Sequence, residues 1–84
     1  MRLVWEEGAL AELEVAAGWS VRQAAPVVWA MQRMADTGLC LGRVSADGLY
    51  RYWPVPPLGV LYRVGGDDLI VVAVMDSRRV RRLP

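Results

Sequence analysis

The chain has 84 residues, a length that allows one domain, expected to span residues 1–84, and leaves no room for a second. One cysteine, Cys40, and no histidine exclude an intramolecular disulfide and a histidine- or multi-cysteine metal site. The formal net charge of +1 gives no general affinity for nucleic acid, and 55% hydrophobic residues is a high share for so small a chain. Because a core of this size is marginal alone, we expect a protein partner to cover part of the apolar surface.

Charged residues are unevenly distributed along the chain. Glutamates gather near the start, at Glu6, Glu7, Glu12 and Glu14, and arginines near the end, at Arg78, Arg79, Arg81 and Arg82. All ten basic residues are arginine, which forms bidentate contacts with phosphate and carboxylate. No apolar run approaches the ~20 residues of a membrane-spanning helix and no signal peptide is visible, so we expect a cytoplasmic protein that makes no use of a membrane.

The start of the chain predicts a strand followed by a helix. Residues 2–5 form the expected strand. After it, Leu10, Leu13 and Ala17 recur at helical spacing and are expected to form the buried face of the first helix. Gly18 can adopt a positive φ, so we expect the first helix to end there.

A second helix is expected directly after the first. Ser20 has the position of an N-cap, and Gln23 completes a capping box with it. Pro26 leaves two alternatives: a helix from Ser20 that kinks at the proline, or a helix that starts near the proline. Gly38 ends the helix in both. The buried face is the same in both and consists of Val27, Val28, Met31, Met34 and Ala35.

The second half of the chain predicts a loop over 39–47 and then three strands. The strands are expected at residues 49–53, 59–64 and 69–75. Proline cannot donate to a sheet ladder, so Pro54 ends the first of them. Gly65 and Gly66 between two apolar runs predict a hairpin. The last strand is apolar at every position, which is typical of a strand covered on both faces.

This order of elements, strand, helix, helix and three strands, predicts an α+β fold. A helical hairpin is expected to pack on one face of a mostly antiparallel four-stranded sheet.

Four segments carry a resemblance to the RelE/ParE superfamily of toxins from bacterial type II toxin–antitoxin systems. At the start, residues 4–5 (Val-Trp), Ala9 and residues 11–13 (Ala-Glu-Leu) resemble the family's opening strand and first helix. Residues 60–64 (Val-Leu-Tyr-Arg-Val), the Gly/Asp turn and residues 69–74 resemble the family's "R-V-L-Y-R-V … D-x-V-V-V-L-x-V" hairpin. Residues 47–51 (Asp-Gly-Leu-Tyr-Arg) resemble the beginning of its second strand. Residues 75–79 (Met-Asp-Ser-Arg-Arg) resemble the "V-x-H-x-R-R" tail of the ParE-like branch. The resemblance covers nearly the whole chain in order, spacing and length.

The resemblance implies a toxin that is neutralised by a cognate antitoxin, with which it forms a hetero-oligomer. Two targets remain open: the ribosome, where such toxins cleave mRNA, and DNA gyrase, which ParE-like members poison. The sequence departs from the nuclease pattern at two places. Gly59 replaces the family's arginine before the "V-L-Y-R-V" run, and no C-terminal aromatic residue or histidine follows Arg79. A catalytically inactive interaction module of the same fold is therefore the alternative to a toxin.

The resemblance and the chemistry of arginine together define the candidate site residues. Arg51, Arg63 and Arg79 are the candidate catalytic residues, since phosphoryl chemistry needs positive groups around the scissile phosphate. Arg78, Arg81 and Arg82 are candidates for binding the target or nucleic acid. Each set has a plainer reading, as solvated strand residues or a solvated tail. No residue is proposed for a metal or a cofactor.

Three further aromatic residues have two readings. Tyr50, Tyr52 and Trp53 can form a surface on which bases stack, or can pack in the core or against an antitoxin. Trp19 and Trp29 are candidate contacts with a partner, and Trp19, beside the break between the two helices, is the better candidate.

Overall fold

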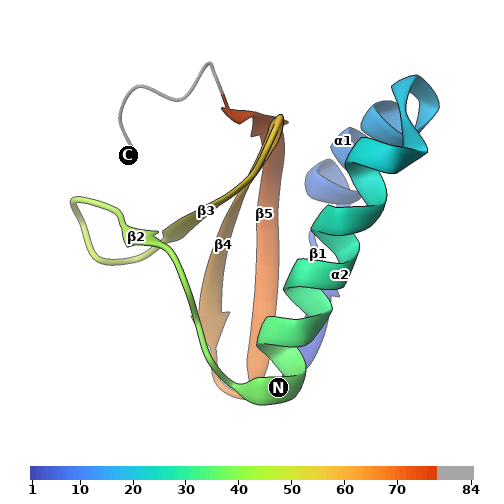
Figure 1. The fold of residues 1–84 in the computed structure, drawn as a ribbon. Helices are drawn as coiled ribbons and strands as arrows, with labels where there is room; N and C mark the ends of the chain where they lie inside the picture. Colours follow the sequence, from blue (N-terminus) through green and yellow to red (C-terminus); the bar gives the residue numbers. More distant parts are fainter. Residues whose placement is uncertain (78–84) are drawn as a thin grey trace.

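The computed structural model describes residues 1–77 and has two helices and a five-stranded sheet (Figure 1). The elements are β1 (Arg2–Trp5), α1 (Glu7–Trp19), α2 (Val21–Thr37), β2 (Arg43–Val44), β3 (Arg51–Val55), β4 (Leu58–Gly65) and β5 (Asp68–Asp76). Their order in the sheet is β1-β5-β4-β3-β2. The helices pack on one face of the sheet, which confirms the predicted α+β class.

The sheet is mixed, with β1 parallel to β5 and the other neighbours antiparallel. The prediction of a mostly antiparallel sheet is therefore confirmed, but the prediction of four strands is wrong. The fifth strand is β2, whose two residues lie in the segment predicted to be a loop. They pair with β3 as Arg43 with Tyr52 and Val44 with Arg51. Two residues carry no periodicity, so no pattern in the sequence predicts this strand.

Side chains of the loop between β2 and β3 bring these two strands together. The Asp47 carboxylate accepts hydrogen bonds from the Ser45 hydroxyl (2.5 Å) and the Leu49 N–H (3.0 Å). The Ser45 hydroxyl oxygen in turn accepts the Tyr50 N–H (3.1 Å). These bonds favour the ionised carboxylate, and the Ser45 hydroxyl is the main reason that the pKa of Asp47 lies below its usual value.

Helix α1 continues past the predicted end. Gly18 lies inside the helix, which ends where the Ser20 N–H donates to the Ala16 carbonyl (2.9 Å). The buried face also differs from the prediction. Ala9 is fully buried, whereas Leu10 is 42% exposed. The small Ala9 side chain lets the helix approach the sheet closely, and Leu10 is turned away from it.

Helix α2 runs from Val21 through Pro26 with Ser20 as its N-cap residue, so the predicted start at Ser20 is confirmed and the alternative start near the proline is wrong. Proline has no N–H to donate, and because Pro26 is exposed, water can hydrogen-bond to the helix carbonyl that the proline leaves without a partner. Ser20 is the N-cap by position, but its side chain makes no capping bond, so the predicted capping box is absent. Gly38 ends the helix with φ of 71°, as predicted.

The core lies between the helices and one face of β4 and β5. Its buried members are Ala9, Val27, Met31, Met34, Ala35, Val60, Tyr62, Leu69, Val71 and Val74. The prediction that Val28 belongs to this set is wrong, since it is 41% exposed. On β5, the side chains between the buried ones are partly exposed, so the expectation of full cover on both faces is met on one face only.

The β3–β4 and β4–β5 hairpins differ in their agreement with prediction. Gly66, with φ of 61°, sits in the turn between β4 and β5, which confirms the predicted hairpin. Pro54 does not end β3, because the strand continues to Val55 and the proline pairs with Gly59 of β4. The proline is tolerated because β2 pairs only with Arg51 and Tyr52, so β3 is an edge strand at Pro54.

Candidate functional site

Two of the predicted catalytic arginines border one cavity at the end of the sheet. Arg51 begins β3 and pairs with Tyr62, the residue before Arg63 on β4. The pleat therefore directs the Arg51 and Arg63 side chains to opposite sides of the ladder. A cavity of about 360 Å³ opens where the loop before β3 leaves the ladder. Its lining is Cys40, Gly48, Leu49, Tyr50, Arg51, Arg63 and Val64.

A buried tyrosine holds one side of this cavity in place. Tyr62 is fully buried, and its hydroxyl donates a hydrogen bond to the carbonyl of Leu41, in the segment that leads from α2 to β2. This bond fixes the segment that carries Cys40 against β4. Burial is the main reason that the pKa of Tyr62 rises to about 12, while the nearby charge of Arg51 acts in the opposite direction.

The arrangement is chemically suited to an anion. Within residues 1–77 neither Arg51 nor Arg63 takes part in an ion pair, and the one salt bridge there joins Arg2 to Asp68. Each of these guanidinium groups, on its own side of the ladder, can bind a phosphate or a carboxylate at the border of the cavity. The other reactive groups at its lining are the Tyr50 phenol and the Cys40 thiol. No cluster of metal-ligating side chains is found in the described part of the chain.

The remaining predicted site residues, Arg78, Arg79, Arg81 and Arg82, lie outside the described residues. Their roles stay predictions.

Gly59 stands where the RelE/ParE pattern has an arginine, and Tyr52 occupies the space that a side chain at position 59 would need. Tyr52 lies on β3, and its ring covers the backbone of Gly59 on β4. A Cβ added to Gly59 would come within 2.5 Å of Tyr52 Cζ. Tyr52 is 8% exposed, and its hydroxyl is buried with no hydrogen-bond partner among the described residues. Trp53 packs against the core cluster. Both rings are therefore largely covered in this structure.

Sequence reasoning missed Arg43, which borders a second cavity of about 450 Å³ together with Gly42, Tyr52, Trp53 and Pro54. Arg43 lies in β2, inside the segment predicted to be a loop. The sequence holds one indication of this strand. Asp47–Gly48 is a turn signal with a predicted strand after it, and such a signal indicates a partner strand before it as well.

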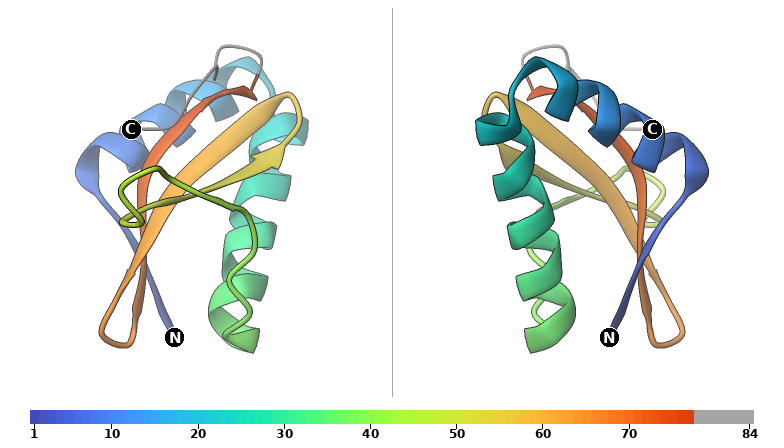
Figure 2. Two further views of the ribbon diagram at one scale, coloured as in Figure 1. Left: turned by 90° about the vertical axis from the view of Figure 1, so that its left-hand side faces the viewer. Right: turned by 90° about the vertical axis from the view of Figure 1, so that its right-hand side faces the viewer.

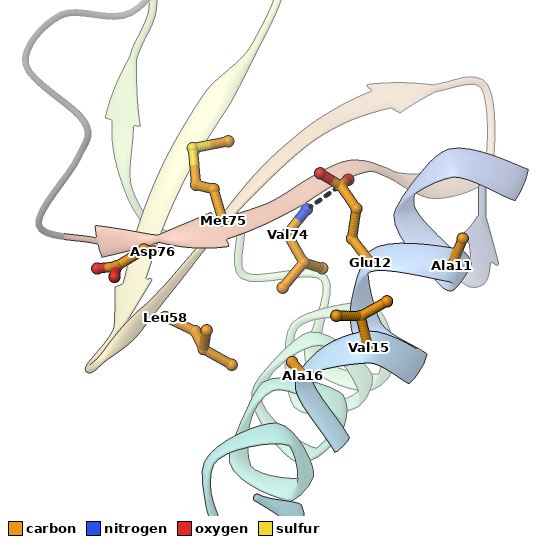
Figure 3. Close-up of a pocket in the computed structure, with 8 residues that line it drawn as sticks. All are labelled: Ala11, Glu12, Val15, Ala16, Leu58, Val74, Met75 and Asp76. Carbon is orange, nitrogen blue, oxygen red and sulfur yellow. Dashed lines mark hydrogen bonds between the residues drawn. The ribbon is translucent and has the colours of Figure 1, made fainter. Parts of the chain in front are cut away.

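An apolar groove of about 370 Å³ lies between α1 and the second half of β5 (Figure 3). Ala11, Val15 and Ala16 of α1 form one wall, and Val74 and Met75 are part of the other. β1 ends before this point, so the β5 edge has no neighbouring strand here. The Glu12 carboxylate accepts the Val74 N–H instead (3.2 Å). The groove thus combines apolar walls with a strand edge that is capped by a side chain.

The described residues form an α+β protein in which a helical hairpin covers one face of a mixed sheet. The same fold occurs in a solved chain described as "Chromosomal ParDE TA system from P. aeruginosa". It matches with a TM-score of 0.61 and 19% identity, over 90% of this chain and 95% of that chain. This likeness is consistent with a RelE/ParE-like fold. No family model and no curated protein matches the chain. Neither helix among residues 1–77 has the length and apolar character needed to cross a membrane.

Proposed function

We propose that this chain is the toxin component of a type II toxin–antitoxin pair. The observation that carries the proposal is the fold shared with a chain of the ParDE system over 90% of the present chain. The sequence resemblance to the RelE/ParE superfamily supports it independently, since the "Val-Leu-Tyr-Arg-Val" segment falls on β4 and the following apolar run on β5. The protein acts in the cytoplasm, where its targets are.

The cavity bordered by Arg51 and Arg63 is the proposed target-binding site, and the catalytic role predicted for Arg79 remains part of the proposal. Its two free guanidinium groups suit an RNA or DNA phosphate, or a carboxylate of a protein target. Cleavage of mRNA on the ribosome also needs a group that moves protons. The Tyr50 phenol, which lines the cavity, is a candidate for this group. Inhibition of DNA gyrase needs none, and both targets therefore stay within the proposal.

The groove beside α1 is the proposed seat of the antitoxin. Its walls are apolar, and Val15, at its lip, is 63% exposed. Glu12 already caps the exposed strand edge, so an entering segment gains mainly by filling the groove with apolar side chains.

The proposal is tested by expressing the chain with and without the product of the adjacent small gene. We expect growth arrest with the chain alone, and normal growth together with a stable complex when both are present. In the complex, Val15→Arg should weaken binding, while Arg22→Glu, on the other helix, should not. Normal growth with the chain alone and no complex would contradict the proposal.

The two targets are separated by what accumulates after induction. Cleavage in the ribosomal A site leaves mRNA 5′ ends in phase with codons, whereas gyrase poisoning leaves broken DNA. Mapping mRNA 5′ ends and assaying DNA breaks in the same culture assigns one target or the other.

A second candidate is an inactive member of this fold that serves only as an interaction module. The observation that favours it is the Tyr52 ring above Gly59, which fills the place of the family's arginine side chain. Growth arrest that is lost in an Arg51→Ala, Arg63→Ala double variant, with binding to the antitoxin retained, would exclude this candidate.

A further inference from the structure

The outer side of the helical hairpin, which faces away from the sheet, exposes large apolar side chains. Trp19 and Val21, at the turn between the helices, are 87% and 68% exposed. Trp29, halfway along α2, is 66% exposed. Tryptophan at such exposure is a typical central residue of a protein interface. The hairpin therefore presents an apolar surface from the turn along α2.

The two helices carry opposite charges on this outer side. The outer face of α1 has Glu7 and Glu14, and the helix contains no basic residue. The outer face of α2 has Arg22 and Arg33. Asp36, the acidic residue of α2, accepts a hydrogen bond from Gln32 (2.8 Å).

None of the four outer charges on Glu7, Glu14, Arg22 and Arg33 is in an ion pair within residues 1–77. Within this part of the chain, the outer face of α1 therefore displays the unpaired negative charges of Glu7 and Glu14, and that of α2 displays the unpaired positive charges of Arg22 and Arg33 beside Asp36, which is bonded to Gln32.

A second copy of the chain can place positive charge against α1 and negative charge against α2 in a single arrangement. From the turn at Ser20 the helices diverge, and both lie on the same side of the sheet (Figure 2). Consider a two-fold axis that passes beside this turn and bisects the angle between the two helices. Rotation about this axis places α1 of one copy antiparallel to α2 of the other copy. Because both helices rise about 1.5 Å per residue, residues equally distant from Ser20 then face each other.

The residues at equal distance are complementary in charge and size. Glu7 lies thirteen positions before Ser20 and Arg33 thirteen after it. Ala11 lies nine before and Trp29 nine after. The indole thus faces a small side chain, and the guanidinium of Arg33, stacked 5.4 Å above the Trp29 ring, faces a carboxylate.

We propose that the chain forms a two-fold homodimer through the outer side of its helical hairpin, with α1 of each copy against α2 of the other. Trp19 and Val21 of the two copies meet at the axis, and Trp29 packs on Ala11 of the partner copy. An isologous interface must be complementary to itself, and opposite charges on the two arms of one hairpin meet this condition. The dimer is independent of whether the chain inhibits growth.

The test is sedimentation equilibrium of the purified full chain over micromolar concentrations. We expect a dimer, and about tenfold or greater weakening by either Glu7→Arg or Arg33→Glu, since each opposes like charges in the interface. The double variant Glu7→Arg, Arg33→Glu exchanges the two charges and should restore the dimer. Trp29→Glu should give a monomer, and circular dichroism verifies that each variant is folded.

Arg63→Glu is the matched control, because it makes the same change of charge on the sheet and should leave the dimer intact. A wild-type chain that stays monomeric throughout this range would overturn the proposal. So would a dimer that the single variants leave unchanged, or one that the exchanged pair fails to restore.

Discussion

The ring of Tyr52 lies on the backbone of Gly59 and fills the space that a side chain at position 59 would need. A methyl group at position 59 would overlap the ring, so Gly59→Ala should force Tyr52 or the backbone to move. We expect a loss of unfolding free energy of about 1–3 kcal/mol, the usual cost of overpacking a buried position. Urea unfolding of the variant measures this loss.

A double-mutant cycle separates the contact from other effects of the substitution. Tyr52→Ala removes the ring, so Gly59→Ala should cost far less in that background. An equal cost in both backgrounds would show that Tyr52 is not the reason for the glycine. Gly8→Ala, where a Cβ meets nothing within 4 Å, is the matched control.

Tyr62 should make the stability of the fold sensitive to alkaline pH. Its pKa is raised to about 12, above the value of 10.0 for a free tyrosine, so the folded state retains a proton that the unfolded chain has lost. The contribution is fully present below pH 10 and is lost as the pH rises toward 12. Denaturant midpoints measured across this range should fall.

Tyr62→Phe should shrink that alkaline loss and also lower stability near neutral pH. The variant leaves the Leu41 carbonyl without the hydroxyl donor, which costs about 1–3 kcal/mol. Tyr50→Phe is the matched control, because it also removes one tyrosine hydroxyl but leaves the bond from Tyr62 to Leu41 in place. An unchanged alkaline profile in Tyr62→Phe would contradict the assignment.

Asp47 should make the β2–β3 loop sensitive to acid. Its folded pKa is lowered, so its contribution is present above about pH 3.9, the usual pKa of an aspartate, and is lost as the pH falls through the folded value. Hydrogen exchange of the Leu49 and Tyr50 amides should therefore show less protection in acid. Asp47→Ala should reduce this protection at neutral pH, and Asp67→Asn, in the other hairpin turn, should have no effect on it.

Arg51 and Arg63 should each contribute to growth inhibition if their cavity binds the target. Replacing either by alanine removes one of two guanidinium groups, with a loss of affinity of about 1.5–3 kcal/mol for a charged hydrogen bond. Graded expression in cells measures the dose needed for arrest. Arg2→Ala, on an exposed arginine at the other edge of the sheet, should leave that dose unchanged once protein levels are matched. Full toxicity of the Arg51→Ala, Arg63→Ala double variant would exclude the cavity as the site.

Elements with a strong local signal could be predicted from the sequence. The β4–β5 hairpin follows from two apolar runs around Gly65 and Gly66, and the end of α2 follows from Gly38. Where a local signal disfavours a helix that tertiary packing stabilises, the packing determines the structure. Gly18 and Pro26 both disfavour a helix, yet both lie inside helices whose buried faces pack on the sheet.

The candidate site was less predictable because it depends on contacts between distant residues. The sequence identifies Arg51 and Arg63 as candidates, but not that a loop leaving the ladder opens a cavity beside both. Arg43 was missed because it lies on a two-residue strand held by side chains of the next loop. The Tyr52–Gly59 contact joins neighbouring strands, and only their register reveals it.

The parallel pairing of β1 with β5 joins residues 2–5 to residues 68–71. β1 therefore stays unpaired until β5 has formed, while α1, α2 and the β3–β4 hairpin can form from local contacts. Contacts of such long sequence separation close late and slow folding. Until they close, the sheet has no β1 edge, and the hairpin of helices that we propose as a dimer surface has no complete sheet to hold it in place.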